Sequence, residues 1–260
     1  MAERSSRVPT PSLRHLAPAP AAPIRLVCFP HAGGSATFYA ALAHALGSQV
    51  DTQAVQYPGR LERRDEPFPE SIAEVADAVV SELAPCLDRP TALFGHSMGA
   101  VVAFEVARRL EALQCPPTWL FISGRGAPSL QPREFTHLLD DQSLLAEMAK
   151  LGGTDRRLLA DEELMQFLLP VIRGDYLTLA SYRHAPGPPL SCPLTAVNGQ
   201  DDTRVSSRTV AAWEQLTTGP FHSLTLRGGH FYLVERAPEV AALLRGCLTD
   251  APRYRDVGRP

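Results

Sequence analysis

Short apolar runs alternate with longer amphipathic segments along most of the chain. The apolar runs have the length of buried strands, and the segments between them carry apolar residues at the spacing of a helix. The pattern predicts strands at 24–29, 52–57, 91–94, 118–123, 193–197 and 223–226, and helices at 38–46, 71–83, 98–113, 209–216 and 238–247. This order predicts an α/β fold with a mostly parallel central sheet and helices on both faces.

The alternation breaks between Leu130 and His184, where only helical spacing occurs. We therefore expect a helical insertion at 130–184 in one core formed by 24–129 and 185–250. Prolines interrupt residues 1–23, which predicts a flexible tail, with an organellar transit peptide as the alternative. Residues 251–260 are expected to be frayed.

The strongest chemical motif is Gly95-His96-Ser97-Met98-Gly99, which lies between a predicted strand and a predicted helix. In that context Gly-x-Ser-x-Gly is typical of a nucleophile elbow, a sharp turn that raises a serine hydroxyl above the sheet. The flanking residues must be small because the turn crowds its neighbours. Ser97 is therefore the candidate nucleophile.

A serine hydroxyl needs a base, and the base needs an orienting acid. His230 follows the last predicted strand, at the carboxyl end of the sheet where Ser97 also lies. Asp202 follows the strand before it and is the expected acid, with Asp201 as the competitor. The remaining histidines sit in helices, strand ends, the tail or the elbow itself and are weaker candidates: His15, His44, His96, His137, His184 and His222.

Two backbone N–H groups are needed to stabilise a tetrahedral oxyanion. Met98 follows the nucleophile, and Ala32 lies in the Pro30-His31-Ala32-Gly33-Gly34 loop after the first predicted strand, so both are candidate donors. That loop lacks the Lys-Ser/Thr of a phosphate loop, and no Cys/His cluster has metal-ligand spacing. We expect neither a cofactor nor a metal.

Composition narrows the possible partners and the compartment. The chain has 260 residues with 45% hydrophobic and 20% charged residues, as in a globular protein, and a net charge of −3. It lacks the global positive charge that favours nucleic acid, and no apolar stretch is long enough to cross a membrane. Five isolated cysteines are typical of reduced thiols, which predicts a cytoplasmic protein.

Several segments together resemble the stand-alone type II thioesterases of polyketide and nonribosomal peptide synthases, in the α/β-hydrolase superfamily. The resemblance spans Ile24 to Leu248. It rests on Phe29 to Gly34, Tyr57-Pro58-Gly59-Arg60 with Glu62, Phe94 to Ala100, Phe121-Ile122-Ser123-Gly124, Gly199 with Asp202, Trp213, and Gly228-Gly229-His230-Phe231. The Pro-His-Ala-Gly-Gly and Tyr-Pro-Gly-Arg segments are more specific to this family than the Gly-x-Ser-x-Gly elbow, which any esterase or lipase could carry.

The resemblance implies hydrolysis of acyl thioesters on the phosphopantetheine arm of an acyl carrier or peptidyl carrier protein. It implies a Ser97–His230–Asp202 triad, oxyanion donors at Ala32 and Met98, and a lid over an acyl chamber. A lipase or carboxylesterase, a chain-releasing or cyclising thioesterase, and a non-catalytic carrier-binding module are the alternatives. Carrier proteins are usually acidic, so the cluster Arg60, Arg63 and Arg64 is either a docking patch or a solvated loop.

Overall fold

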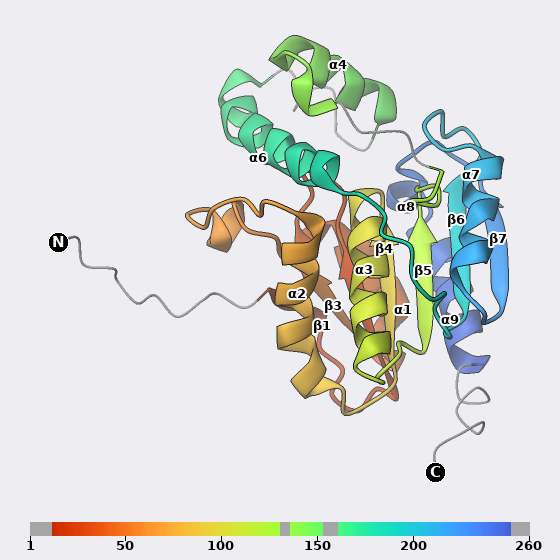
Figure 1. The fold of residues 1–260 in the computed structure, drawn as a ribbon. Helices are drawn as coiled ribbons and strands as arrows, with labels where there is room; N and C mark the ends of the chain where they lie inside the picture. Colours follow the sequence, from red (N-terminus) through yellow and green to blue (C-terminus); the bar gives the residue numbers. More distant parts are fainter. Residues whose placement is uncertain (1–11, 131–135, 153–160, 251–260) are drawn as a thin grey trace.

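A seven-stranded sheet forms the centre of the computed structural model, which describes residues 12–130, 136–152 and 161–250 (Figure 1). Six strands are parallel and the first is antiparallel, in the order β1-β3-β2-β4-β5-β6-β7. The strands are β1 (Leu13–Ala17), β2 (Ile24–Phe29), β3 (Val50–Val55), β4 (Thr91–His96), β5 (Trp119–Ser123), β6 (Leu194–Gly199) and β7 (Phe221–Leu226). The predicted fold class is confirmed.

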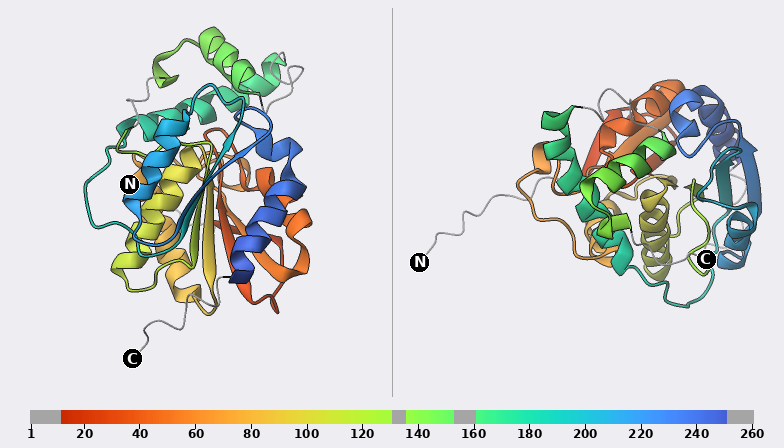
Figure 2. Two further views of the ribbon diagram at one scale, coloured as in Figure 1. Left: turned by 90° about the vertical axis from the view of Figure 1, so that its right-hand side faces the viewer. Right: turned by 90° about the horizontal axis from the view of Figure 1, so that it is seen from above.

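Helices cover both faces of this sheet (Figures 1 and 2). On one face α2 (Ile72–Leu83) packs beside α3 (Met98–Ala112), and on the other α1 (Ala40–Leu46) packs beside α9 (Ala237–Asp250). Short helices α7 (Ser207–Ala211) and α8 (Tyr232–Glu235) complete the two layers. Side chains of β2 alternate between the two cores, as strand geometry requires: Val27 and Phe29 join one, Leu26 and Cys28 the other.

The start of α2 follows its sequence signal. The Ser71 hydroxyl accepts a hydrogen bond from the Glu74 amide at 3.1 Å, and the Glu74 carboxylate accepts one from the Glu70 amide at 2.8 Å. The first bond satisfies one of the otherwise unpaired donors at the helix N-terminus, and the second holds the amide just before the cap. Elsewhere the predicted boundaries shift by a few residues: β3 begins at Val50 rather than Thr52, and 3-10 turns at Ala36–Tyr39 and Ala212–Leu216 replace part of two predicted helices.

The expected flexible tail was wrong for residues 12–23, because the sheet already begins at Leu13. Strand β1 pairs antiparallel with β3, with Leu13 opposite Val55. The carboxylate of Glu82 in α2 accepts hydrogen bonds from the backbone N–H groups of Ser12 and Leu13. Prolines are compatible with this strand because they lie outside it, and pairing with a distant strand leaves little local signal. The rest of the expected tail lies outside the described residues.

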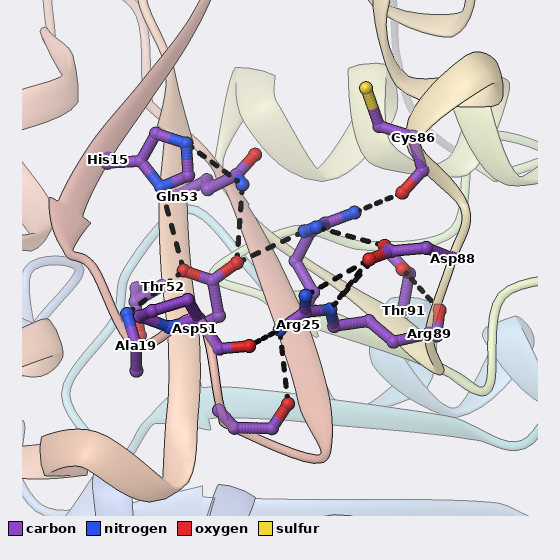
Figure 3. A network of polar contacts seen from close by, with 12 residues as sticks. His15, Ala19, Arg25, Asp51, Thr52, Gln53, Cys86, Asp88, Arg89 and Thr91 are labelled. Atoms are coloured by element: carbon purple, nitrogen blue, oxygen red, sulfur yellow. Dashed lines mark hydrogen bonds and ion pairs between the residues drawn. The ribbon is translucent and has the colours of Figure 1, made fainter.

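A network of polar contacts holds together the amino-terminal ends of strands β2 and β3 (Figure 3). The buried Arg25 guanidinium of β2 contacts Asp51 of β3 at 3.3 Å, the Cys86 carbonyl at 2.5 Å and Asp88 at 3.2 Å. Asp51 also accepts a hydrogen bond from the Ala19 amide, which ties the segment after β1 to the sheet. The charge of Arg25 is thus balanced mainly by a buried carboxylate.

Loss of that carboxylate should destabilise the fold. Asp51→Ala leaves the Arg25 charge buried with only an exposed partner, so the free energy of unfolding should fall by about 3 kcal/mol. Urea denaturation followed by circular dichroism measures the loss. Asp88→Ala is the matched control: it removes the exposed partner of the same guanidinium, and should change stability far less. Equal losses in the two variants would contradict the assignment.

Between residues 130 and 184, the described segments hold a 3-10 turn at Thr136–Leu138 and two helices, α4 (Asp141–Leu151) and α6 (Glu162–Ser181). Both helices lie above the carboxyl end of the sheet (Figure 1). Asp140 and Asp161 cap them, since each carboxylate accepts a hydrogen bond from an amide three residues on. No strand occurs in the described part of this range.

Candidate active site

Ser97 lies at a strained turn where β4 ends and α3 begins. Its φ of 55° is in the left-handed region, and its amide donates to the Ser123 carbonyl of β5 at 2.9 Å. A β-carbon at Gly95 would overlap the Gly99 carbonyl oxygen, and one at Gly99 would overlap the carbonyl of Phe29 in β2. The two glycines are therefore a steric requirement of the turn. Residues 91–96 and 98–100 are buried, whereas Ser97 is partly exposed.

His230 and Asp202 meet at the same end of the sheet. His230 Nδ1 lies 2.8 Å from Asp202 Oδ2, and both side chains are buried. The adjacent Asp201 is exposed and contacts the histidine loop through its backbone, donating to the Gly228 carbonyl. Of the two candidate acids, Asp202 is thus the one that binds the histidine.

The carboxylate of Asp202 is itself oriented. Its second oxygen accepts the Arg204 amide at 2.9 Å, so both oxygens have a partner. The loops carrying the acid and the histidine are joined by backbone hydrogen bonds, including Gln200 N–H to the Leu226 carbonyl at 2.7 Å. Gly199 makes this approach possible, since a β-carbon there would overlap the Gly229 carbonyl oxygen.

His230 lies beside the elbow. Its ring centroid is 5.0 Å from that of His96, the residue before Ser97. Gly124, at the end of β5, makes room for both rings: a β-carbon there would lie 2.7 Å from Cε1 of His96 and 3.3 Å from Cε1 of His230. The structure therefore brings the Ser97 elbow and the His230–Asp202 pair to one place.

His96 is held in a separate hydrogen-bond chain. Its Nδ1 lies 2.9 Å from the Ser123 hydroxyl, which lies 2.6 Å from the Tyr232 hydroxyl. Burial, followed by the charges of His230 and His31, holds the pKa of His96 well below its ordinary value. Burial, followed by His230 and Arg60, likewise lowers the pKa of His31 to about 3. A lowered pKa makes both imidazoles weak bases; Ser123 and Tyr232 had no predicted role.

One candidate oxyanion donor lies within the elbow and the other in the loop after β2. Met98 is the first residue of α3, where amide groups have no acceptor within the helix. Ala32 lies in the loop after β2, which closes as a turn through a hydrogen bond from Gly34 N–H to the His31 carbonyl at 2.9 Å. Gly33 has a φ of 80°, which favours glycine.

The arginine cluster was interpreted wrongly. Arg60 and Arg63 are buried, only 6% and 8% exposed, so neither is in a docking patch or a solvated loop. Arg60 pairs with Asp175 of α6, and Arg63 pairs with Glu66 and donates to the Gln56 carbonyl. Only Arg64 is exposed. Each buried arginine finds its partners in the folded structure, a fact that charge spacing along the chain does not reveal.

In the part of the chain that the structure describes, no cluster of His, Cys, Asp and Glu side chains could hold a metal ion. None of its helices has the length and hydropathy of a membrane-spanning segment. Cys28, Cys86, Cys115 and Cys192 form no disulfide.

An elbow serine beside a His–Asp pair at the carboxyl edge of a parallel sheet defines a hydrolase site on an α/β-hydrolase fold. The Thioesterase domain family matches residues 24–247, and the chain belongs to that family. It is a thioester hydrolase, as the sequence predicted.

Similar proteins come from biosynthetic pathways. The thioesterase PikA5 of Streptomyces venezuelae is 45% identical over 230 residues, covering 88% of this chain and 82% of that protein. The gramicidin S biosynthesis protein GrsT of Aneurinibacillus migulanus is 35% identical and covers 85% and 87%. The structure of the type II thioesterase BorB from the borrelidin biosynthetic cluster superposes with a TM-score of 0.86 at 44% identity, covering 94% of this chain and 100% of that one.

The neutral state of His96 makes stability depend on pH. An unfolded histidine binds a proton below about pH 6.5 and burial lowers the pKa of His96, so this residue contributes a fall of up to about 1.4 kcal/mol per pH unit in the free energy of unfolding below that value. His96→Asn keeps a polar group for Ser123 and removes the titration. Its stability, measured by urea denaturation between about pH 6 and pH 4, should fall less steeply by up to that amount. An unchanged slope would show that His96 is protonated in the fold.

Proposed function

We propose that this enzyme hydrolyses acyl thioesters carried on the phosphopantetheine arm of an acyl carrier or peptidyl carrier protein in secondary-metabolite biosynthesis. The observation that carries the proposal is the His230–Asp202 contact beside the Ser97 elbow, in a chain of the thioesterase family. The biosynthetic setting is supported by the names of relatives such as GrsT and BorB, which cover most of the chain.

In the proposed mechanism His230 is the base and then the acid. Its Nε2 takes the proton of Ser97 as the hydroxyl oxygen attacks the thioester carbonyl carbon. The carbon–sulfur bond then breaks, and the pantetheine sulfur leaves as a thiol with the proton from His230. Water, deprotonated by His230, attacks the acyl-serine and releases the acid. Asp202 orients the imidazole through Nδ1 and stabilises its charged form.

The oxyanion of each tetrahedral intermediate would be bound by the N–H groups of Ala32 and Met98. Support comes from their positions, one after β2 and one at the N-terminus of α3, where the helix dipole also favours negative charge. A thioester has a good leaving group, so stabilisation of this charge carries much of the catalysis.

Residues 130–184 are proposed to be the lid over an acyl chamber. Their two described helices stand above the edge of the sheet that carries the site (Figure 2). Leu144 of α4 and Met165 of α6 are buried, whereas Phe167 is 76% exposed. Cys28, Cys86, Cys115 and Cys192 form no disulfide, which is compatible with a reducing cytoplasm, the compartment that we propose.

A lipase or carboxylesterase would use the same residues on oxygen esters, and a cyclising thioesterase would release a lactone rather than an acid. Comparing the turnover of matched thioester and oxyester substrates distinguishes a thioesterase from a lipase or carboxylesterase. Mass spectrometry of the product distinguishes a hydrolytic thioesterase from a cyclising one. A non-catalytic carrier-binding module would bind the acylated carrier without turnover.

Ser97→Ala should abolish hydrolysis of an acyl-pantetheine substrate, because no acyl-serine can form. Release of thiol measures turnover, and circular dichroism checks that the fold is intact. The wild-type enzyme should also form a covalent adduct with a fluorophosphonate probe, and the variant should not. Undiminished turnover in Ser97→Ala would disprove the proposed nucleophile.

The neighbouring residues Asp201 and Asp202 allow a matched pair of substitutions. Asp202→Asn leaves the shape of the site and removes the charge that orients His230, so kcat should fall by about 10⁴-fold. Asp201→Asn changes an exposed side chain and should leave kcat within about twofold. The pair is compared with the same acyl-pantetheine substrate. If Asp201→Asn is the impaired variant, the proposed acid is wrong.

A further inference from the structure

Helix α6 contacts the loop that carries the candidate oxyanion donor Ala32 at two points. A β-carbon on Gly33 would lie only 2.6 Å from Cγ1 of Ile172, so the helix packs against the backbone of the loop. Three residues further, on the same face of α6, the Asp175 carboxylate accepts the Gly33 N–H at 2.7 Å.

The same carboxylate holds Arg60. Arg60 donates from Nη1 to Asp175 Oδ2 at 2.7 Å and from Nη2 to Oδ1 at 2.5 Å, and both side chains are nearly completely buried. Arg60 Nη1 also donates to the Gly34 carbonyl at 2.9 Å. Asp175 and Arg60 together therefore bind a donor and an acceptor of the two residues that follow Ala32.

These contacts fix a specific backbone conformation. Residues 31–34 form a turn closed by Gly34 N–H and the His31 carbonyl, with positive φ at its third residue, Gly33, as in a type II turn. Types I and II differ by a flip of the central peptide, here the one between Ala32 and Gly33. A flip would turn the Gly33 N–H away from Asp175. The carboxylate therefore selects the orientation of the peptide next to the Ala32 amide.

We propose that Asp175, held by Arg60, is a positioning residue for the oxyanion hole: it anchors the Gly33 N–H and, through Arg60, the Gly34 carbonyl, and thereby holds the turn that carries the Ala32 N–H in place. This inference rests on the proposed function, since it assumes that Ala32 is an oxyanion donor. It gives Asp175 of α6 a part in transition-state stabilisation through the backbone of the loop.

The neighbouring residue of α6 reaches the other side of the site. The Tyr176 hydroxyl accepts a hydrogen bond from Arg204 Nη1 at 3.2 Å, and the Arg204 amide binds Asp202. One turn of α6 therefore contacts both the loop that carries Ala32, here called the oxyanion loop, and the loop that carries Asp202. A buried ion pair adds little net stability compared with apolar packing. The main consequence of the Asp175–Arg60 pair is therefore the position of the backbone groups that it binds.

The test compares two changes in α6. Asp175→Ala removes the acceptor of Gly33 N–H, and kcat, normalised to active sites titrated with a fluorophosphonate, should fall by about 10- to 100-fold with KM within about twofold. The Ki of a trifluoromethyl ketone analogue, which forms an oxyanion on Ser97, should rise by a similar factor. Thr178→Val is the matched control. Its hydroxyl anchors α6 to the Pro69 carbonyl at 2.6 Å and does not touch the oxyanion loop, so kcat per site should stay unchanged.

A second variant keeps the test decisive if Asp175→Ala does not fold with Arg60 left unpaired. Arg60→Met with Asp175→Leu replaces the ion pair by apolar side chains and restores packing, and its kcat per site should still be low. A normal kcat per site in either folded variant would overturn the proposal. If kcat per site is normal in these variants while Ser97→Ala is inactive, only the role of Asp175 is refuted and the proposed function stands. If Ser97→Ala still turns over the substrate, the proposed function itself is refuted.

Discussion

The active-site end of the structure depends on the close approach of three backbones, those of β2, β4 and the first turn of α3. Gly99 lies directly against the Phe29 carbonyl and Gly95 against the Gly99 carbonyl, so the chain turns sharply between them. The turn forces Ser97 into the left-handed region and raises it above the buried residues on either side. The same turn sets the first amide of α3 beside the serine. One steric constraint thus places both the proposed nucleophile and one of the two candidate oxyanion donors.

The partners of three buried histidines near this point distinguish them. His96 and His31 are kept neutral because they lie in apolar surroundings beside other rings, with His31 against Phe38 and Phe231. His230 is also buried, but it has a carboxylate at Nδ1, which is the arrangement that stabilises an imidazolium during proton transfer. Identical side chains within about 6 Å of one another therefore differ in function through their partners.

Sequence reasoning succeeded where the determining interactions are local. The elbow glycines, the Ser71 cap and the strand-end positions of Asp202 and His230 depend on a few neighbouring residues and on the parallel arrangement of strands. It failed for β1, which is stabilised by pairing with β3, and for Arg60, whose partner lies 115 residues away. Asp175 did leave one signal: it occupies the apolar face of its helix, three residues after Ile172 and four before Leu179. An acid on such a face needs a buried partner, and spacing alone cannot name it.

The contacts of α6 limit how a lid could open. From Ile172 onward the helix is tied to the core by packing on Gly33, by the Asp175–Arg60 pair and by the hydrogen bond from Thr178 to Pro69. Detaching this half would expose a buried ion pair and release the oxyanion loop at the same time. The preceding half presents Phe167 to solvent but also buries Met165 and Val171. If the proposed lid moves while the proposed oxyanion hole stays formed, the second half of α6 has to remain with the core, because its contacts hold the loop that carries Ala32.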